Sequence, residues 1–120
     1  MKTFDLEECL IAFSVIIVEM TKQMSNSYAA SHLSKQLLRS GTSVSLNYGE
    51  AQSGESKKDF IHKMKIVLKE FRETFIYLKI IERTQLYKNQ AAIEKIKQEN
   101  NELISIFVKS IATAQKNVKS

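Results

Sequence analysis

The sequence contains no proline and only three glycines, Gly41, Gly49 and Gly54, among its 120 residues. Sheet proteins need many turns, and turns are rich in these two residue types, so their scarcity favours an all-helical chain. With 43% hydrophobic and 26% charged residues, the composition is typical of a folded domain and not of a disordered segment. The length fits a single domain with its own core.

Cysteine and long apolar runs are also scarce. The single cysteine, Cys9, cannot form an internal disulfide, which favours a reducing cytoplasm. We interpret Cys9 as a core residue, with a reactive thiol as the alternative. The most apolar run, residues 9–18, is about half as long as the roughly 20 residues of a membrane span. It follows Asp5, Glu7 and Glu8, where a signal peptide would carry basic residues. We therefore expect a cytoplasmic protein with no membrane partner.

Residues typical of catalytic and metal sites are sparse. His32 and His62 have no cysteines at zinc-binding spacing, and Asp59 with His62 is one imperfect copy of a motif that a di-metal bundle needs twice. The scattered glycines exclude a phosphate-binding loop, and no pattern suggests a Ser, His and acid set. We expect a non-enzymatic protein without metal or cofactor. An enzyme with an unrecognised site is the alternative.

Apolar residues at steps of three and four predict helices at about residues 5–24, 28–51, 57–83 and 90–118. In the first helix these residues are Leu6, Leu10, Phe13, Ile17, Met20 and Met24. Polar residues suited to N-caps precede the other three helices, at Ser25-Asn26-Ser27, Ser56 and Asn89. The sequence therefore predicts an all-α, up-down-up-down four-helix bundle that forms one domain over residues 1–120.

The first helix has a second apolar row, made of Ile11, Val15 and Val18. A helix that is apolar on more than one side is buried, and in a small bundle this indicates a contact between subunits. The alternative is that this helix occupies the middle of the core of one subunit.

Polar and small residues interrupt the apolar pattern at several positions. Ser40 and Gly41 would let a neighbouring helix approach closely, and Asn100 occupies a core position where one buried Asn commonly fixes register. A polar row runs along residues 28–51, and solvent exposure is the favoured interpretation for most of it. Its members are Gln36, Ser40, Ser43, Asn47 and Glu50. For Asn47 and Glu50, partly buried anchoring between helices is the alternative.

The positive charge of the chain, +5 in all, is concentrated in its second half. Residues 57–83 carry eight cations against four acids, and their spacing places one row on one helical face. The row consists of Lys58, His62, Lys65, Lys69, Arg72 and Lys79. It is about 30 Å long at roughly 1.5 Å per residue. Such a basic stripe is either a solvated face or a surface for a polyanion.

Four blocks of sequence carry a resemblance to a known family. They are QLLRSGTSVSLNYGEA (36–51), SKKDFIHKMKIVLKE (56–70), RETFIYLKIIE (72–82) and SIATAQKN (110–117). In this order they resemble the bacterial four-helix bundle proteins encoded in intervening sequences of 23S ribosomal RNA genes, whose biochemical role is not established. That family is similar to the accessory variability protein of diversity-generating retroelements. The resemblance implies a five-subunit ring with a basic surface and a nucleic-acid-binding role, in the retroelement case alongside a reverse transcriptase.

Individual positions match the patterns of this family. Its Ser-x-x-x-Asn-x-x-Glu pattern corresponds to Ser43, Asn47 and Glu50, preceded by an arginine at Arg39, and its Asp-Phe pair to Asp59 and Phe60. The loop at residues 52–55 departs from the family, because Glu55 lies where relatives tend to carry arginines. This departure leaves Lys57, Lys58 and the basic stripe as the better phosphate-binding candidates.

We therefore expect a homo-oligomer, a pentamer by resemblance, that binds RNA or DNA through cations of the second and third helices. These cations are Arg39, Lys57, Lys58, Lys65, Lys69, Arg72 and Lys79, and His62 adds charge at lower pH. The alternative is a protein-interaction scaffold with no nucleic-acid role, in which a few apolar anchors supply the binding energy for a protein partner.

Overall fold

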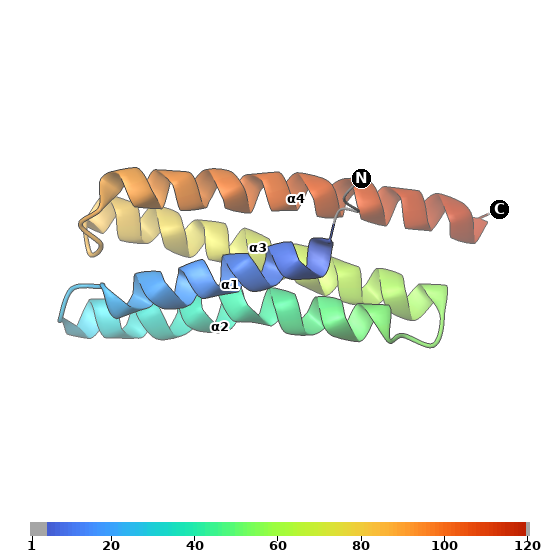
Figure 1. Cartoon of the computed structure of the whole chain (residues 1–120), viewed down its shortest axis with the longest axis horizontal. Helices are drawn as coiled ribbons and strands as arrows, with labels where there is room; N and C mark the ends of the chain where they lie inside the picture. The colour runs from blue at the N-terminus through green and yellow to red at the C-terminus, as the bar shows by residue number, and fades with distance from the viewer. Residues whose placement is uncertain (1–4, 120) are drawn as a thin grey trace.

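The computed structural model describes residues 5–119. Its four helices are α1 (Leu6–Lys22), α2 (Tyr28–Gln52), α3 (Lys57–Thr84) and α4 (Gln90–Lys119). Successive helices run in opposite directions, so the predicted all-α, up-down-up-down bundle is confirmed (Figure 1). The predicted bounds are close to the observed ones. The largest difference is at the end of α1, where the helix stops at Lys22 before the polar residues of the loop.

Each helix begins at a side chain that accepts a hydrogen bond from the backbone of the first turn. The caps are Asp5 to the amide of Glu8, Ser27 to Ala30, Ser56 to Asp59 and Asn89 to Ala92, at 3.0–3.2 Å. These bonds satisfy backbone donors that the helix itself leaves unpaired. Polar caps at fixed positions therefore explain why the helix starts could be predicted so closely.

One aromatic ring from each helix meets in the core. Phe71 of α3 lies 5.5 Å from the ring of Phe13 of α1 and 5.6 Å from that of Phe107 of α4, and Phe107 lies 5.8 Å from Tyr48 of α2. The distances are between ring centroids. The two outer pairs are edge-on, the arrangement that aromatic quadrupoles favour. All three phenylalanine side chains are completely buried, so this chain of rings joins the four helices at the centre of the bundle.

The α1 and α2 helices pack closely at Gly41. A Cβ atom at this position would lie 2.8 Å from Cγ2 of Ile17, so only glycine leaves room for that side chain. Beside it, the Ser14 hydroxyl donates to the carbonyl of Gly41 at 3.0 Å and lies 2.7 Å from the Ser45 hydroxyl. The close approach predicted at Ser40 and Gly41 is therefore confirmed.

The polar row of α2 faces α3, so the prediction that most of the row is solvated is wrong for its central members. Ser40 is completely buried, and the Thr74 hydroxyl donates to it at 2.8 Å. Glu50 forms an ion pair with Lys63 of α3 at 3.2 Å. The half-buried Asn47 donates to the carbonyl of Ser43. Polar residues in a row predict a solvated face, but the α3 residues that pair with Ser40 and Glu50 are distant in sequence.

Asn100 is completely buried, as predicted from its position in the helical pattern. Its Nδ2 atom donates to the carbonyl of Phe71 at 3.1 Å, whereas its Oδ1 atom has no hydrogen-bond partner among the described residues. A buried polar group without a partner costs free energy, so this asparagine strongly favours the one register of α3 and α4 that provides the Phe71 carbonyl.

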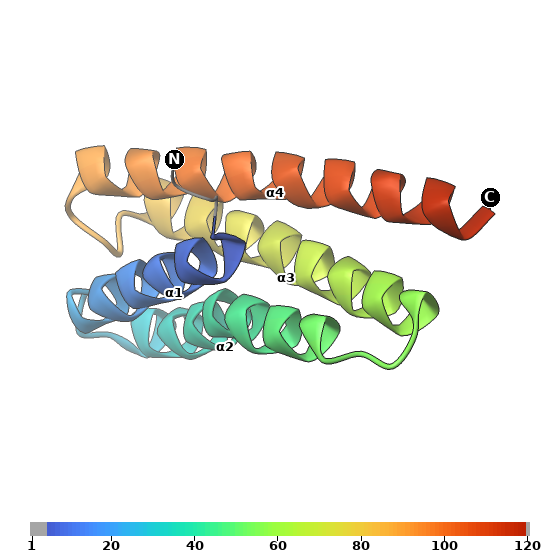
Figure 2. The same cartoon turned by 45° about the vertical axis from the view of Figure 1, so that its right-hand side comes forward.

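The two ends of the bundle differ. At one end the two loops are joined, because both the amide and the hydroxyl of Ser25 donate to the carbonyl of Leu86 at 2.9 Å. Toward the other end α3 and α4 separate, so that the start of α3 lies well below the end of α4 in both views (Figures 1 and 2). The α1 and α4 helices meet at few points. The separated end is where the basic stripe begins.

Candidate nucleic-acid interface

The structure places the basic stripe on the outer face of α3. The side chains of Lys58, His62, Lys65, Lys69 and Arg72 are all exposed, and so is Lys57 at the start of the helix. Lys79 is only half-exposed, and its ammonium group lies 4.8 Å from the centre of the Phe75 ring. The aromatic face is a favourable site for a cation. Lys79 is therefore partly engaged within the protein, whereas the other five side chains project into solvent.

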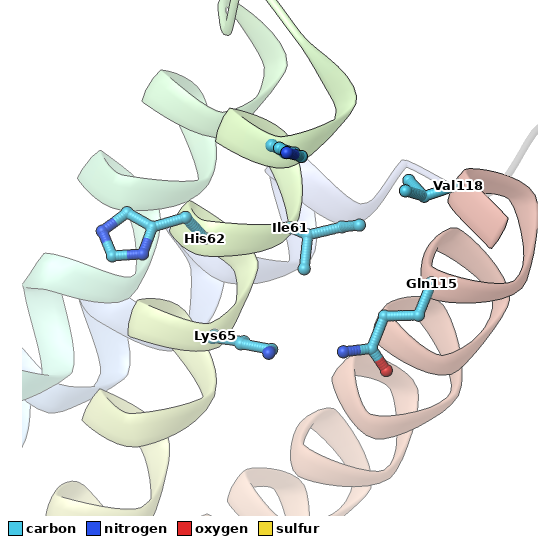
Figure 3. Close-up of a pocket in the computed structure, with 6 residues that line it drawn as sticks. Ile61, His62, Lys65, Gln115 and Val118 are labelled. Atoms are coloured by element: carbon cyan, nitrogen blue, oxygen red, sulfur yellow. The ribbon is translucent and has the colours of Figure 1, made fainter.

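These side chains line two consecutive grooves that share Lys65. The first, which we call the α3–α4 groove, has a volume of about 350 Å³ and lies where the two helices separate (Figure 3). It is lined by Lys58, Ile61, His62, Lys65, Gln115 and Val118. The second, which we call the α3 groove, has a volume of about 420 Å³ and is lined by Lys65, Leu68, Lys69, Arg72, Glu73 and Ile76. The stripe thus follows two shallow, open grooves over much of its length.

The cations in the grooves are not neutralised by the protein itself. Within residues 5–119, Lys58, Lys65, Lys69 and Arg72 form no ion pair. Glu73 is the one acid among the residues that line the two grooves. Four uncompensated cations close together repel one another, so this surface favours a bound anion.

Lys97 on α4 shows the opposite behaviour. Its ammonium group lies 2.7 Å from Glu82 and 3.2 Å from Glu94, and it is largely buried. The hydrogen bond with Glu82 raises the pKa of Lys97 above its ordinary value despite the effect of burial. This cation stabilises the contact between α3 and α4 and is not available to a ligand.

Arg39, predicted to contact phosphate, lies in an ion-pair cluster between α2 and α3. Its guanidinium nitrogens lie 3.3 Å from Glu70 and 3.3 Å from Glu73. Burial acts to lower the pKa of Arg39, but the hydrogen bond to Glu73 and the charges of both acids outweigh it and the pKa is raised. Burial raises the pKa of Glu70, and Glu73 adds to this effect, while Arg39 and Ser43 oppose it. Two acids around one cation make this cluster a weaker anion site than the stripe.

The side chains predicted to form a subunit contact lie on the outer side of α1. Val15 is 53% exposed and Ile11 is 40% exposed, whereas Val18 is half-buried. Leu46 of α2 is another exposed apolar side chain. The backbones of α1 and α3 do not touch within the described residues, so the two helices are diagonal in the bundle. The apolar side of α1 and the basic face of α3 therefore point in different directions.

The residues that match the family motifs support the packing and capping of the helices and do not line the grooves. The Ser43 hydroxyl donates to the carbonyl of Ser40 within α2, and Glu50 pairs with Lys63 of α3. Asp59 provides the capped amide of α3, and Phe60 packs partly buried against the core. Cys9 is also partly buried against the core. In residues 5–119, no three His, Cys, Asp or Glu side chains are grouped so as to hold a metal ion. No helix in that part of the chain is long and apolar enough to span a membrane.

The apolar and amide side chains of the grooves could not be recognised as surface residues from the basic pattern alone. Ile61, Leu68 and Ile76 line the grooves, and Ile76 is 50% exposed between cations. Gln115 and Val118 come from α4, and no local pattern connects them with a stripe on α3. The spacing of Ile76, four residues after Arg72, is a signal that could have been used.

These features define a class of protein: a four-helix bundle whose third helix carries an uncompensated basic face. Comparison with protein families identifies it further. The model of the 23S rRNA-intervening sequence protein family matches residues 4–109, and the chain belongs to this family. A solved relative is a protein of unknown function from the S23 ribosomal protein family of Bacteroides thetaiotaomicron. It is 34% identical, with a TM-score of 0.82 over 89% of this chain and 98% of the other. No curated protein matches the chain.

Proposed function

We propose that this protein is a non-enzymatic, cytoplasmic homo-oligomer that binds nucleic acid through the basic face of α3. The observation that carries the proposal is that Lys58, Lys65, Lys69 and Arg72 line two consecutive grooves without an ion pair in the described chain. Cations on one helical face neutralise phosphates and release counterions, which gives binding with little sequence preference.

Oligomerisation is the second part of the proposal, with a ring of five as the form that the family resemblance implies. Exposed Ile11 and Val15 support it, because removal of apolar side chains from water favours association. A ring that buried the α1 side would still present one basic face per subunit to solvent. Several identical faces bind a long polyanion with higher avidity than one face can provide.

The test is fluorescence anisotropy with structured RNA and duplex DNA at roughly 50 and 200 mM salt. Contacts to five phosphates, from Lys58, Lys65, Lys69, Arg72 and Lys79, predict a roughly 500-fold loss of affinity over this range. In the variant Lys65→Glu/Lys69→Glu/Arg72→Glu, two contacts remain, so the same change of salt should cost only about twelvefold. Its affinity at the lower salt should fall by more than about 100-fold.

A matched control reverses three exposed lysines outside the grooves, Lys35→Glu/Lys88→Glu/Lys95→Glu. Both triple variants change the net charge by the same amount, so they separate a local site from overall charge. The control should retain most of the affinity. Equal losses in the two variants, or parental affinity in the α3 variant, would show that the basic face is not the site.

A protein-interaction scaffold is the second candidate, because the α3 face also exposes Ile76 and Ile80, at 50% and 39%. In this case the binding energy would come from a few apolar anchors. Absence of binding to either nucleic acid at roughly 50 mM salt would favour the scaffold.

A further inference from the structure

The α3–α4 groove and the α3 groove differ in a way that bears on which form of nucleic acid they fit. The α3 groove is lined by one helix only and includes the acid Glu73. The α3–α4 groove has a second wall from the end of α4, which adds an amide and an apolar side chain, Gln115 and Val118. Phosphate binding requires neither of these two side chains. They indicate a ligand that also has an apolar face and a hydrogen-bonding edge.

The orientation of the side chains divides the α3–α4 groove into two parts. Ile61 of α3 and Val118 of α4 approach each other across the groove, and the Lys65 ammonium points toward the Gln115 amide (Figure 3). His62 points away from α4. Lys58 and Lys65 are two helical turns apart on the α3 wall. The groove thus has cations along its α3 wall and an apolar floor, which Ile61 and Val118 form from opposite sides. This floor ends at the Gln115 amide.

A nucleobase in a duplex cannot use such a site, because its faces are stacked and its pairing edge is occupied. An unpaired base can leave the stack, pack its face on protein side chains and use its free edge for hydrogen bonds. A Gln amide offers both a donor and an acceptor to that edge. The volume of about 350 Å³ is within the usual range of roughly 300–1,000 Å³ for small-molecule sites, so one nucleotide can be accommodated.

We propose that the α3–α4 groove holds one unpaired nucleotide of a single-stranded nucleic acid, with its phosphate at Lys58, its base between Ile61 and Val118, and its base edge at Gln115 beside Lys65. This inference rests on the proposed nucleic-acid function and specifies the ligand of the same face. The neighbouring phosphates of the strand follow Lys69 and Arg72 along the α3 groove. Because the floor is aliphatic and not aromatic, the contribution of the base is smaller than on an aromatic platform.

The test compares single-stranded RNA and DNA oligonucleotides with the duplex of the same sequence, by fluorescence anisotropy at roughly 50 mM salt. The variant Gln115→Ala/Val118→Ala removes the two base contacts that α4 provides and retains Ile61 and every cation. We expect it to lose about five- to tenfold in affinity for the single strands and less than twofold for the duplex. Gln98→Ala/Val108→Ala is the matched control, because it removes the same residue types from exposed positions of α4 outside this groove. It should bind as the parent does.

An oligonucleotide with abasic sites provides an independent test, because it retains phosphates and lacks bases. Parental protein should bind it about five- to tenfold more weakly than the intact strand, and for Gln115→Ala/Val118→Ala this difference should be less than about twofold. If Gln115→Ala/Val118→Ala loses equal affinity for intact RNA and DNA strands, the contact is to the base. A loss with RNA alone would assign part of the contact to the 2′-hydroxyl, and both outcomes support an unpaired nucleotide.

The outcomes that overturn the proposal are distinct from failure of the proposed function. If single strands and duplex bind equally and the double variant matches the parent, the groove does not hold a base. If the Lys65→Glu/Lys69→Glu/Arg72→Glu variant then loses both ligands, nucleic-acid binding by the basic face still stands. If the parent binds no nucleic acid at roughly 50 mM salt, both proposals fail.

Discussion

The α1–α2 and α3–α4 pairs are both antiparallel helical hairpins, but they pack in opposite ways. In the first, Gly41 lets Ile17 approach the α2 backbone, and the hydroxyls of Ser14 and Ser45 close the contact. In the second, the helices separate toward the end of α4 and leave a groove beside Lys58 and Lys65. Small residues let the first two helices pack closely, whereas long cationic side chains lie where the other two separate. The first pair is therefore closely packed, and the second carries the surface for which we propose ligand binding.

The outer surfaces of α1 and α3 differ as well. Ile11 and Val15 expose hydrocarbon on α1, while α3 exposes a row of cations with apolar side chains between them. An apolar surface favours association with a similar surface, and a basic one resists it through repulsion. The two faces therefore differ in the partners that we propose for them, another subunit for α1 and a polyanion for α3.

The largest effect is expected from a charge placed on the apolar side of α1. Val15→Asp places a charge at the proposed subunit contact and should convert the oligomer to monomers, measured by sedimentation velocity. The loss of avidity should lower affinity for a long RNA by about 100-fold, although every cation is retained. Val108→Asp is the control, because Val108 is exposed to a similar extent on α4. If Val15→Asp remained an oligomer, the contact would lie elsewhere.

The next effect concerns the close packing of α1 on α2. Gly41→Ala should lower the free energy of unfolding by about 1–3 kcal/mol, because the new methyl group would overlap Ile17. Gly49→Ala on the same helix meets no atom within 4 Å and should raise the stability by up to about 1 kcal/mol through helix propensity. Urea unfolding at one protein concentration measures both. A stabilising Gly41→Ala would contradict the close approach of the two helices.

The smallest effect concerns Glu70, which links α2 to α3. An acid whose pKa is raised in the folded state binds more protons there than in the unfolded chain. The stability that this group contributes is therefore greatest below its unfolded pKa and declines as pH rises through the folded one. Glu70→Gln should remove this decline, with a change below about 1 kcal/mol between pH 4 and 7. The measurement is the free energy of unfolding across that pH range, with the exposed Glu102→Gln as control. If the free energy changed with pH equally in the parent and in Glu70→Gln, the assignment to Glu70 would be wrong.

The features that could be predicted from the sequence are those set by local spacing. The apolar steps of three and four and the caps at Ser27, Ser56 and Asn89 define the helices, and the same spacing defines the stripe. A buried Asn100 followed from its position in that pattern. Such features need only the geometry of one helix.

The features that could not be predicted depend on how two helices are aligned. Arg39 pairs with acids 31 and 34 residues away, and the partner of Ser40 is Thr74, 34 residues away. Likewise, Gln115 reaches the α3–α4 groove only because of the angle between α3 and α4. No short-range pattern contains this information, so the ion-pair cluster and the second wall of the groove required the structure.

The contact between Ser25 and Leu86 has a mechanical consequence. Two hydrogen bonds to one carbonyl fasten the α1–α2 loop to the α3–α4 loop, so at that end the two hairpins cannot move apart without breaking both. At the opposite end α4 extends past the start of α1 and has fewer neighbours to restrain it (Figure 1). The fastened loops therefore hold the bundle more firmly at their end than it is held toward the end of α4. The amide of Ser25 should accordingly exchange slowly for a loop residue, and exchange along α4 should become faster from the buried Phe107 toward Gln115.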